Sequence, residues 1–465
     1  MLKSIQSISN IFYNDFNKII ANIVKSFYNG VMRHLSSLIL ELESLPKGNV
    51  YKKNISGKEY FYHQYSENGK MVTKLVNKSD LDELLKNIVR RQSIEKMLRD
   101  SNPNKQQTIS LSENARHLTG SVMHKDEEVA RFINDELVYI DENRSPFLIK
   151  RTHSLSNWLM SRVIDNTRVN SRLLKKAFNI NESKEEMIPL YAHAASISDR
   201  YWFKPKQSKL KYKDVIFEND IYSEISLEGS MLIYPNKPKA SPELTTIGSF
   251  EKGWKYINNE WWLYKVGNTN EIFSELLAYE ISMMLLIPSA TYEYDEPYIR
   301  TLNFAEHQDY ESLQSYLGDD SSYSFVFSKL KELGDYYAKA YLRLIFCDVL
   351  VNNVDRHNEN IGFLRDERTG KIVSLAPNFD NNLALISRTT DLVLDPSNDG
   401  FMNHFIKEIS KNEEMMKMYK ELDIPIINEN IIEMCISRVP VKVDNIDRIK
   451  QYLLNRYNYL ISKLK

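Results

Sequence analysis

The chain is poor in the residues that interrupt or cross-link a polypeptide. Gly and Pro number only 14 each among 465 residues, so long linkers of flexible composition are not expected. The two cysteines, Cys347 and Cys435, are too few and too far apart for a zinc cluster or a disulfide framework. This usage indicates a protein of the reducing cytoplasm.

Long apolar runs and an excess of one charge are also missing. No segment approaches the roughly 18 apolar residues that a membrane helix needs, and the N-terminus lacks the apolar core of a signal peptide. We therefore expect a cytoplasmic protein without a membrane partner. A formal net charge of -1 gives the whole chain no reason to bind nucleic acid. With 42% hydrophobic and 26% charged residues, the composition is that of a globular protein, and the length suggests two or three domains.

The most informative feature that is present is a segment rich in Asp and Asn. Asp355 and Asn360 lie five residues apart, and Asp380 follows about twenty residues later. Protein kinases use this spacing for a catalytic base and two magnesium ligands. Because phosphoryl transfer mainly requires positioning and charge neutralisation, these three residues predict a phosphotransferase.

These residue types also have a purely structural use. Asp and Asn are common in turns, where their side chains bond to the backbone. For any single one of them, that interpretation is the preferred one. For three at this spacing, bracketed by apolar runs typical of a helix and two strands, the catalytic interpretation is preferred.

The order of the letters differs from that of an ordinary protein kinase, which has His-Arg-Asp and later Asp-Phe-Gly. Here the corresponding triplets are Asp355-Arg356-His357 and Phe379-Asp380-Asn381. Asp-Arg-His-x-x-Asn after an apolar helix, followed by Leu-Ala-Pro-x-x-Asp, resembles the HipA-like kinases, bacterial serine/threonine kinases named after a persistence toxin. The resemblance runs from Phe346 to Asp380.

This resemblance implies roles for the residues that match. Asp355 would be the catalytic base or hydroxyl-orienting group, Asn360 and Asp380 would be the magnesium ligands, and His357 would brace the loop. ATP and Mg²⁺ are the implied cofactors, and a protein Ser or Thr is the implied acceptor. An antitoxin or another regulatory protein is an implied partner.

A glycine-containing turn about a hundred residues upstream is the candidate phosphate loop. Gly248 and Gly253 have the spacing of a Walker A motif, but Trp254-Lys255 follows where Lys-Ser or Lys-Thr should stand, which excludes a P-loop NTPase. The segment instead resembles the phosphate-binding loop of HipA-like kinases, so Gly248, Ser249 and Lys252 are candidate nucleotide contacts. Taken alone, Lys252 would be interpreted as an exposed turn residue.

The lysine of the ATP site is expected at the end of the following strand. The alternating aromatic run over residues 260–266 predicts that strand, and Lys265 matches the family lysine that would neutralise the phosphates. Glu275, in the helical pattern that follows, would be its ion-pair partner, with Glu280 as the competing choice. A solvated strand lysine is the alternative, but the position of Lys265 between the turn and the helix favours the functional interpretation.

We expect an α+β fold with a two-lobed, protein-kinase-like core, a helical C-terminal lobe and small α/β modules ahead of the core. The core would span about 236–465, with a strand-rich lobe over about 236–305 and a helical lobe over about 306–465. Residues 126–235 resemble the extension that precedes the core in HipA-like proteins.

Residues 1–125 are predicted to form a helix-hairpin-helix module and a linker. Apolar residues recur at helical spacing over residues 8–27, Asn68-Gly69 separates two alternating runs, and a charged helix is expected over residues 80–100. The module carries 19 Lys and Arg against 11 Asp and Glu, so it is where nucleic acid would bind. A solvated helix face is the preferred interpretation of this charge.

Two other functions remain open from the sequence. The first is a pseudokinase or scaffold, which would bind nucleotide without transferring phosphate. The second is a small-molecule kinase, whose acceptor would not be a protein. The family resemblance further implies autophosphorylation on a serine near the phosphate loop, for which Ser249 and Ser241 are the candidates. A serine used only for its small size and its turn-forming hydroxyl is the alternative there.

Overall fold

The computed structural model describes residues 41, 44–55, 58–67, 70–100, 111–133, 136–178, 180–220, 222–229 and 240–464. The chain divides into two compact units, which we call the first unit (Met1–Gln107 with Ile233–Lys237) and the second unit (Thr108–Leu232 with Pro238–Lys465). The helix expected over residues 8–27, the Asn68-Gly69 turn and residues 101–110 of the linker expected over residues 101–125 lie outside the described residues. The described remainder of that segment is not a plain linker, because it contains a helix over Glu113–Arg116 and a strand over Gly120–His124. None of the described helices is both long enough and apolar enough to cross a membrane.

The first unit contains an antiparallel sheet and a helix. Its strands β1 (Asn49–Ile55), β2 (Lys58–Glu67) and β3 (Lys70–Val76) pair in the order β1-β2-β3. The antiparallel pairing of β2 with β3 confirms the predicted hairpin. Helix α2 (Leu81–Asp100) is the charged helix expected after it.

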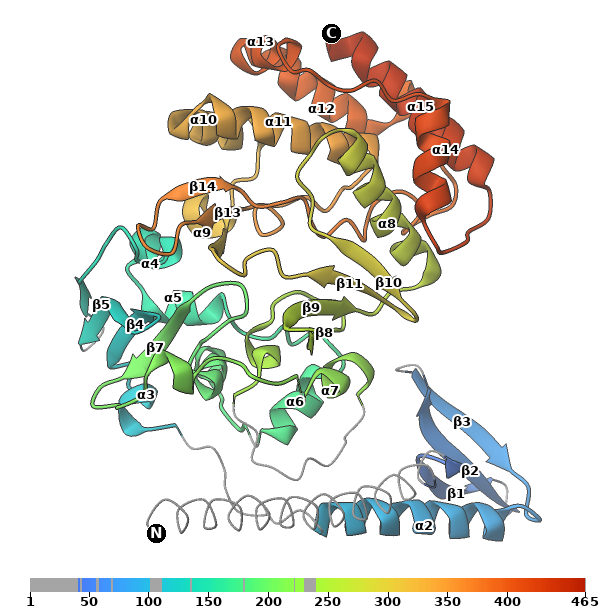
Figure 1. Ribbon diagram of the computed structural model, residues 1–465. Coiled ribbons are helices and arrows are strands. Elements are labelled where there is room, and N and C mark those ends of the chain that lie inside the picture. Colours follow the sequence, from blue (N-terminus) through green and yellow to red (C-terminus); the bar gives the residue numbers. More distant parts are fainter. Residues whose placement is uncertain are drawn as a thin grey trace, which may run out of the picture. The chain divides into compact units, whose positions relative to one another are not determined.

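The second unit contains a four-stranded antiparallel sheet in the order β6-β5-β4-β7. Figure 1 labels its strands β5, β4 and β7. The strands are β4 (Gly120–His124), β5 (Glu127–Ile133), β6 (Glu136–Tyr139) and β7 (Tyr201–Pro205). Strands β5 and β6 are the pair predicted around residues 132–139. Because β4 pairs with β5 and β7, this sheet joins residues from both sides of the boundary placed at residue 125.

Short helices surround and follow this sheet. They are α3 (Glu113–Arg116), α4 (Phe147–Thr152), α5 (Leu155–Met160), α6 (Ser171–Ala177), η1 (Glu185–Ala192), η2 (Tyr212–Asp214), α7 (Ser223–Glu228) and η3 (Pro242–Thr245). The buried side chains of Phe132, Trp158 and Phe203 belong to one apolar cluster that joins the sheet to α5. The segment between α5 and α6 carries Arg168, which the site below requires.

A second four-stranded antiparallel sheet, in the order β10-β11-β9-β8, carries the candidate lysines. Its strands are β8 (Lys252–Ile257), β9 (Glu260–Lys265), β10 (Tyr292–Asp295) and β11 (Tyr298–Leu302). Strand β9 confirms the strand predicted over residues 260–266. Helix α8 (Thr269–Met284) begins where the side chain of Asn268 caps the amides of Asn270 and Glu271, and it carries Glu275.

The remainder of the second unit is mainly helical. The small antiparallel sheet β12-β13-β14 is formed by Asp309–Ser312, Gly362–Arg365 and Ile372–Leu375. The helices are α9 (Leu313–Leu317), α10 (Tyr323–Leu333), α11 (Asp335–Leu350), η4 (Pro396–Asn398), α12 (Gly400–Lys411), α13 (Glu413–Lys420), α14 (Glu429–Arg438) and α15 (Ile446–Leu464). The helices expected over residues 325–352 and 401–465 are therefore confirmed, including the breaks near Pro425 and Pro440.

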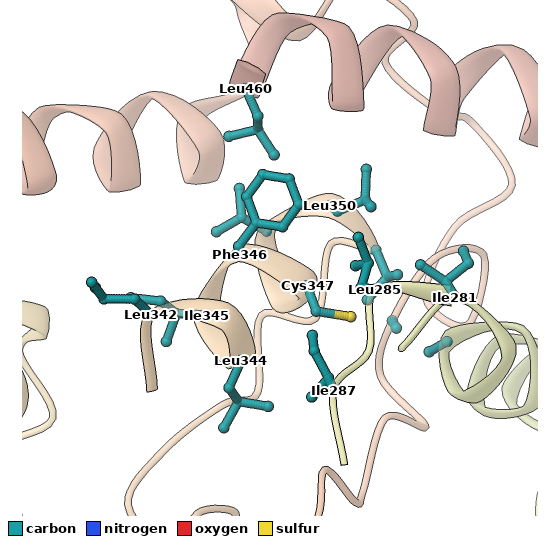
Figure 2. Packing of buried hydrophobic residues seen from close by; sticks show 14 of the residues in the cluster. Ile281, Leu285, Ile287, Leu342, Leu344, Ile345, Phe346, Cys347, Leu350 and Leu460 are labelled. Atoms are coloured by element: carbon teal, nitrogen blue, oxygen red, sulfur yellow. The ribbon is translucent and has the colours of Figure 1, made fainter. Parts of the chain in front are cut away.

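Helix α11 is fixed by apolar packing just ahead of the Asp355 loop. Figure 2 shows Phe346, Cys347 and Leu350 of α11 in one buried cluster with Ile281 of α8 and Leu460 of α15. Each such side chain contributes on the order of 1.5–3 kcal/mol when fully buried. The packing thus ties the end of α11 to the helix that carries Glu275. Both cysteines are free and buried.

Candidate active site

Lys265, at the end of β9, is the centre of the site. Its side chain is buried, and Nζ donates to Glu275 Oε1 at 3.0 Å and to Asp380 Oδ1 at 2.8 Å. Burial alone would lower the pKa of Lys265, but the two carboxylates outweigh it and raise the pKa well above its usual value. The expected Lys265–Glu275 pair is present, whereas Glu280 pairs with Arg438 at 3.2 Å.

Asp380 is held in a turn with its carboxylate ionised. Its backbone has φ +59°, which Asp tolerates better than most residues, and its N–H donates to Tyr292 Oη at 2.9 Å. Burial favours the neutral acid, but the ammonium groups of Lys265 and Lys252 prevail and lower the pKa of Asp380. A carboxylate in this environment stays charged and is suited to bind a cation.

Asp355 lies in the loop that follows α11. Its N–H donates to Asn353 Oδ1 at 3.3 Å, and its carbonyl accepts from Asn360 Nδ2 at 3.0 Å. Burial raises the pKa of its carboxyl, Asp380 adds to this rise, and His357 opposes it. Within the described residues no hydrogen bond engages the Asp355 carboxylate, so its oxygens are free to accept a proton.

His357 contacts two neighbouring residues of the loop, and its Nδ1 accepts from the Glu359 N–H at 3.3 Å. Its Nε2 lies 3.3 Å from Asn360 Nδ2, and its side chain is 45% exposed. The main brace is Arg356, whose side chain is only 5% exposed and pairs with Asp348 of α11 at 2.9 Å. Arg356 is part of the Asp355-Arg356-His357 motif, but the sequence did not predict that it braces the loop.

The guanidinium of Arg356 joins the Asp355 loop to the Asp380 segment. Its other bonds go to two backbone carbonyls and two side-chain amides: Asn360 O and Phe379 O, both at 2.7 Å, Asn378 Oδ1 at 2.6 Å and Asn381 Oδ1 at 2.9 Å. Because one buried cation holds both segments, Asn360 and Asp380 are fixed relative to each other. The bonding partners lie up to 25 residues away, which local pattern reading does not detect.

The donor set fits a magnesium ion that shares its ligands with a nucleotide. Asn360 uses Nδ2 to bond the loop backbone, which leaves its Oδ1 for a ligand, and Asp380 supplies carboxylate oxygen. Mg²⁺ is commonly held by one or two such oxygens together with waters and phosphates. Across the part of the chain that the structure describes, no three His, Cys, Asp or Glu residues gather to hold a metal by themselves.

The glycine turn brings a second lysine to the same place. Gly248 has φ +99°, and a Cβ there would collide with Lys252 Nζ. Lys252 is buried at the start of β8, so its interpretation as an exposed turn residue is wrong. The pKa of Lys252 is lowered to about 8: burial is the largest cause, Lys265 and Arg168 add to the lowering, and Asp380 opposes it.

The two candidate serines lie in different environments. Ser249 is exposed in the turn beside Gly248. Ser241 is buried, and its hydroxyl accepts from the Glu243 N–H at 3.3 Å as the N-cap of η3. A kinase acceptor hydroxyl must be reached from solvent, so only Ser249 is placed for modification.

Comparison with known proteins finds a family model that matches a short segment and solved structures with a similar fold. A family model described as a domain of unknown function, DUF6788, matches residues 28–86. No curated protein sequence matches the chain. Among solved structures, the chain is similar to the structure titled as the Shewanella oneidensis toxin–antitoxin system HipA, HipB and its operator DNA. The identity is 13%, the TM-score is 0.50, and the match covers 74% of this chain and 98% of that one.

A second solved structure is similar over a smaller part of the chain. The Helicobacter pylori proinflammatory kinase CtkA matches with 22% identity and a TM-score of 0.37, over 46% of this chain and 90% of that one. The likeness to HipA is the one that bears on architecture. The chain is a mixed α/β protein with a HipA-like kinase fold.

Proposed function

We propose that this chain is an ATP- and Mg²⁺-dependent serine/threonine protein kinase of the HipA-like type. The observation that carries the proposal is the buried Lys265, bonded to Glu275 on one side and to Asp380 on the other. Kinases need this lysine–glutamate pair and the metal-binding Asp together in order to bind and orient the phosphates. A two-lobed core with the nucleotide between the lobes is part of the same proposal.

The chain's own residues would divide the work of phosphoryl transfer. Lys265 and Lys252 would bind phosphate oxygens, and Asn360 with Asp380 would hold Mg²⁺, which supplies charge neutralisation when bound. The Asp355 carboxylate would take the proton of the acceptor hydroxyl. The oxygen of the acceptor hydroxyl would form a bond to the γ-phosphorus, and the bond from this phosphorus to the ADP oxygen would break. Asp355 suits this role because its oxygens are free and its pKa is raised.

Radiolabelled ATP tests the proposal and separates it from the alternatives. The protein is incubated with Mg²⁺ and γ-labelled ATP alone, with a protein fraction depleted of metabolites, and with a metabolite pool depleted of protein. Label on protein Ser or Thr, absent with Asp355→Asn, is the expected result. Label only in the metabolite pool would establish a small-molecule kinase. ATP binding without any transfer would establish a pseudokinase or scaffold.

A regulatory protein partner belongs to the proposal as well. The HipA structure that this chain resembles was solved with HipB and operator DNA, and we propose that an antitoxin-like protein controls this chain too. The proposed location is the cytoplasm, where ATP and reduced thiols coexist. Affinity purification from the native host, with Asp355→Asn to prevent toxicity, would identify such a partner by mass spectrometry.

A further inference from the structure

A buried arginine from the extension ahead of the core reaches the glycine turn. Arg168 lies between α5 and α6 and is 2% exposed. Its Nε donates to Gly248 O at 2.7 Å, and its Nη2 donates to Thr246 O at 2.6 Å and to Ile247 O at 2.9 Å. One guanidinium therefore binds three consecutive backbone carbonyls of the turn, about 80 residues away in sequence.

These bonds determine where the N–H groups of the turn point. In a trans peptide the carbonyl of one residue and the N–H of the next point in opposite directions. The N–H groups of Ile247, Gly248 and Ser249 must then point away from Arg168. Over the described part of the chain, no backbone carbonyl accepts from any of the three. Successive unpaired N–H groups in a turn form an anion-binding concavity.

The arginine is costly where it lies. Burial lowers the pKa of Arg168, and the carboxylates of Glu243 and Glu251 only partly oppose this. Among the described residues, its Nη1 is buried without an acceptor. An unpaired buried polar group destabilises a fold, so stability alone does not account for an arginine at this position.

We infer that Arg168 is a positioning residue for nucleotide phosphates, and this inference rests on the proposed kinase function. By binding the three carbonyls, Arg168 holds the amides of Ile247, Gly248 and Ser249 ready for phosphate oxygens before the nucleotide arrives. Preorganisation of this kind improves binding because the turn has less freedom to lose. It gives the extension a task in the reaction, since a core without this segment would lack the brace of its phosphate loop.

Substitution of Arg168 has a matched control in the same extension. Arg162 is also a buried arginine, and it donates to Ala194 O at 2.9 Å and to Asp199 Oδ2 at 2.5 Å, outside the turn. Both residues are replaced by Gln and by Lys. A lysine cannot reproduce the guanidinium fork that reaches three carbonyls, so Arg168→Lys should behave like Arg168→Gln.

Binding of ADP and of adenosine to the full-length chain tests the inference. For Arg168→Gln we expect roughly a tenfold to hundredfold loss of ADP affinity, the size of about one charge-assisted hydrogen bond, and a matching rise in KM for ATP. Adenosine has no phosphates, so its affinity should stay within about twofold. The Arg162 variants should change ADP and adenosine affinity equally or not at all. Equal losses for ADP and adenosine in Arg168→Gln, or wild-type ADP affinity, would overturn the inference.

Two further readouts keep the outcome decisive. If the Arg168 variants do not fold, amide hydrogen exchange of the wild-type protein replaces them: ADP, but not adenosine, should protect the amides of residues 247–249, and unchanged exchange would overturn the inference. If the wild-type protein binds no nucleotide at all, the proposed kinase function fails first. Wild-type binding that Arg168 substitution does not weaken removes this inference alone.

Discussion

Lys265 and Lys252 both lie near Asp380, but their pKa values are shifted in opposite directions. Lys265 bonds two carboxylates directly, so its charge is secured and its pKa is raised. Lys252 has no such bond in the described residues, so burial, together with the nearby cations Lys265 and Arg168, outweighs Asp380 and lowers its pKa to about 8. One lysine is therefore a permanent part of the site, and the other is a charge that pH can remove.

The pH dependence of nucleotide binding should report on Lys252. A lysine with a lowered pKa is charged below that pKa and neutral above it, so attraction for phosphate is present below pH 8 and lost above it. Without Mg²⁺, calorimetric ADP affinity should fall by up to about tenfold per pH unit above pH 8. In Lys252→Arg the charge persists to higher pH, and the fall should disappear. An equal fall in both proteins would assign the titration to another group.

Substitutions of the two acidic residues should separate transfer from nucleotide binding. Asp355→Asn removes the proposed proton acceptor, so phosphate transfer should fall by at least about a hundredfold while ATP affinity stays within about threefold. Asp380→Ala removes a proposed metal ligand, so Mg²⁺-dependent ATP affinity should fall as well. Wild-type turnover of Asp355→Asn at saturating ATP would show that the base lies elsewhere.

At the scale of elements, the pair between Arg356 and Asp348 connects helix α11 to the loops of the site. Both side chains are nearly inaccessible, and Arg356 also bonds both loop segments. Burial raises the pKa of Asp348, and the guanidinium opposes that rise. The packing of α11 against α8 and α15 thus reaches the Asp355 loop through one ion pair.

Removal of Asp348 should therefore destabilise the whole second unit. Asp348→Ala leaves the Arg356 charge buried without its carboxylate, which costs about 3–5 kcal/mol of unfolding free energy. Urea unfolding followed by fluorescence measures this. The matched control is Asp391→Ala, because Asp391 pairs with Arg448 at 3.2 Å but is 95% exposed. That exposed pair should contribute less than about 1 kcal/mol. Similar losses for both substitutions would contradict the role of the buried pair.

In the turn after η3, we expect autophosphorylation of one of the two candidate serines. Incubation with Mg²⁺ and ATP should place phosphate on the exposed Ser249 and not on the buried capping Ser241. A phosphate there carries close to two negative charges and would compete with ATP for the same amides and lysines. Peptide mass spectrometry decides this, with Asp355→Asn as the control that should remain unmodified. Phosphate on Ser241, or none after prolonged incubation of an active enzyme, would contradict it.

The parts of this site that could be predicted are those that local order encodes. The period of β9 and the helical pattern of α8 placed Lys265 and Glu275 on adjoining elements. Their pairing was implied by the family resemblance, with Glu280 as the competing choice. The burial of Lys252 and the contacts of Arg168, Tyr292 and Arg356 did not follow from the sequence. They depend on tertiary contacts between segments that lie up to 88 residues apart, as in the bond from the Asp380 N–H to Tyr292, and no period in the sequence marks them.

At the scale of the whole molecule, every described contact of the candidate site lies within the second unit. Arg168, Gly248, Lys265 and Asp380 are all contributed by Thr108–Leu232 and Pro238–Lys465. The first unit carries the match to the domain of unknown function and the basic excess. Phosphate transfer and any binding of nucleic acid are thus expected to be separable by truncation.

A chain that begins at residue 108 should keep the kinase chemistry and lose the basic module. Its ATP affinity should stay within about twofold of the full chain, because no described bond of the site is removed.

If the basic residues bind nucleic acid, the full chain should bind a DNA or RNA duplex with an affinity that falls steeply with salt, and the truncated chain should not. Fluorescence anisotropy at two salt concentrations measures this. Arg168→Gln in the truncated chain should weaken ADP binding as it does in the full chain. A large loss of ATP affinity on truncation alone would show that the first unit contributes to the site.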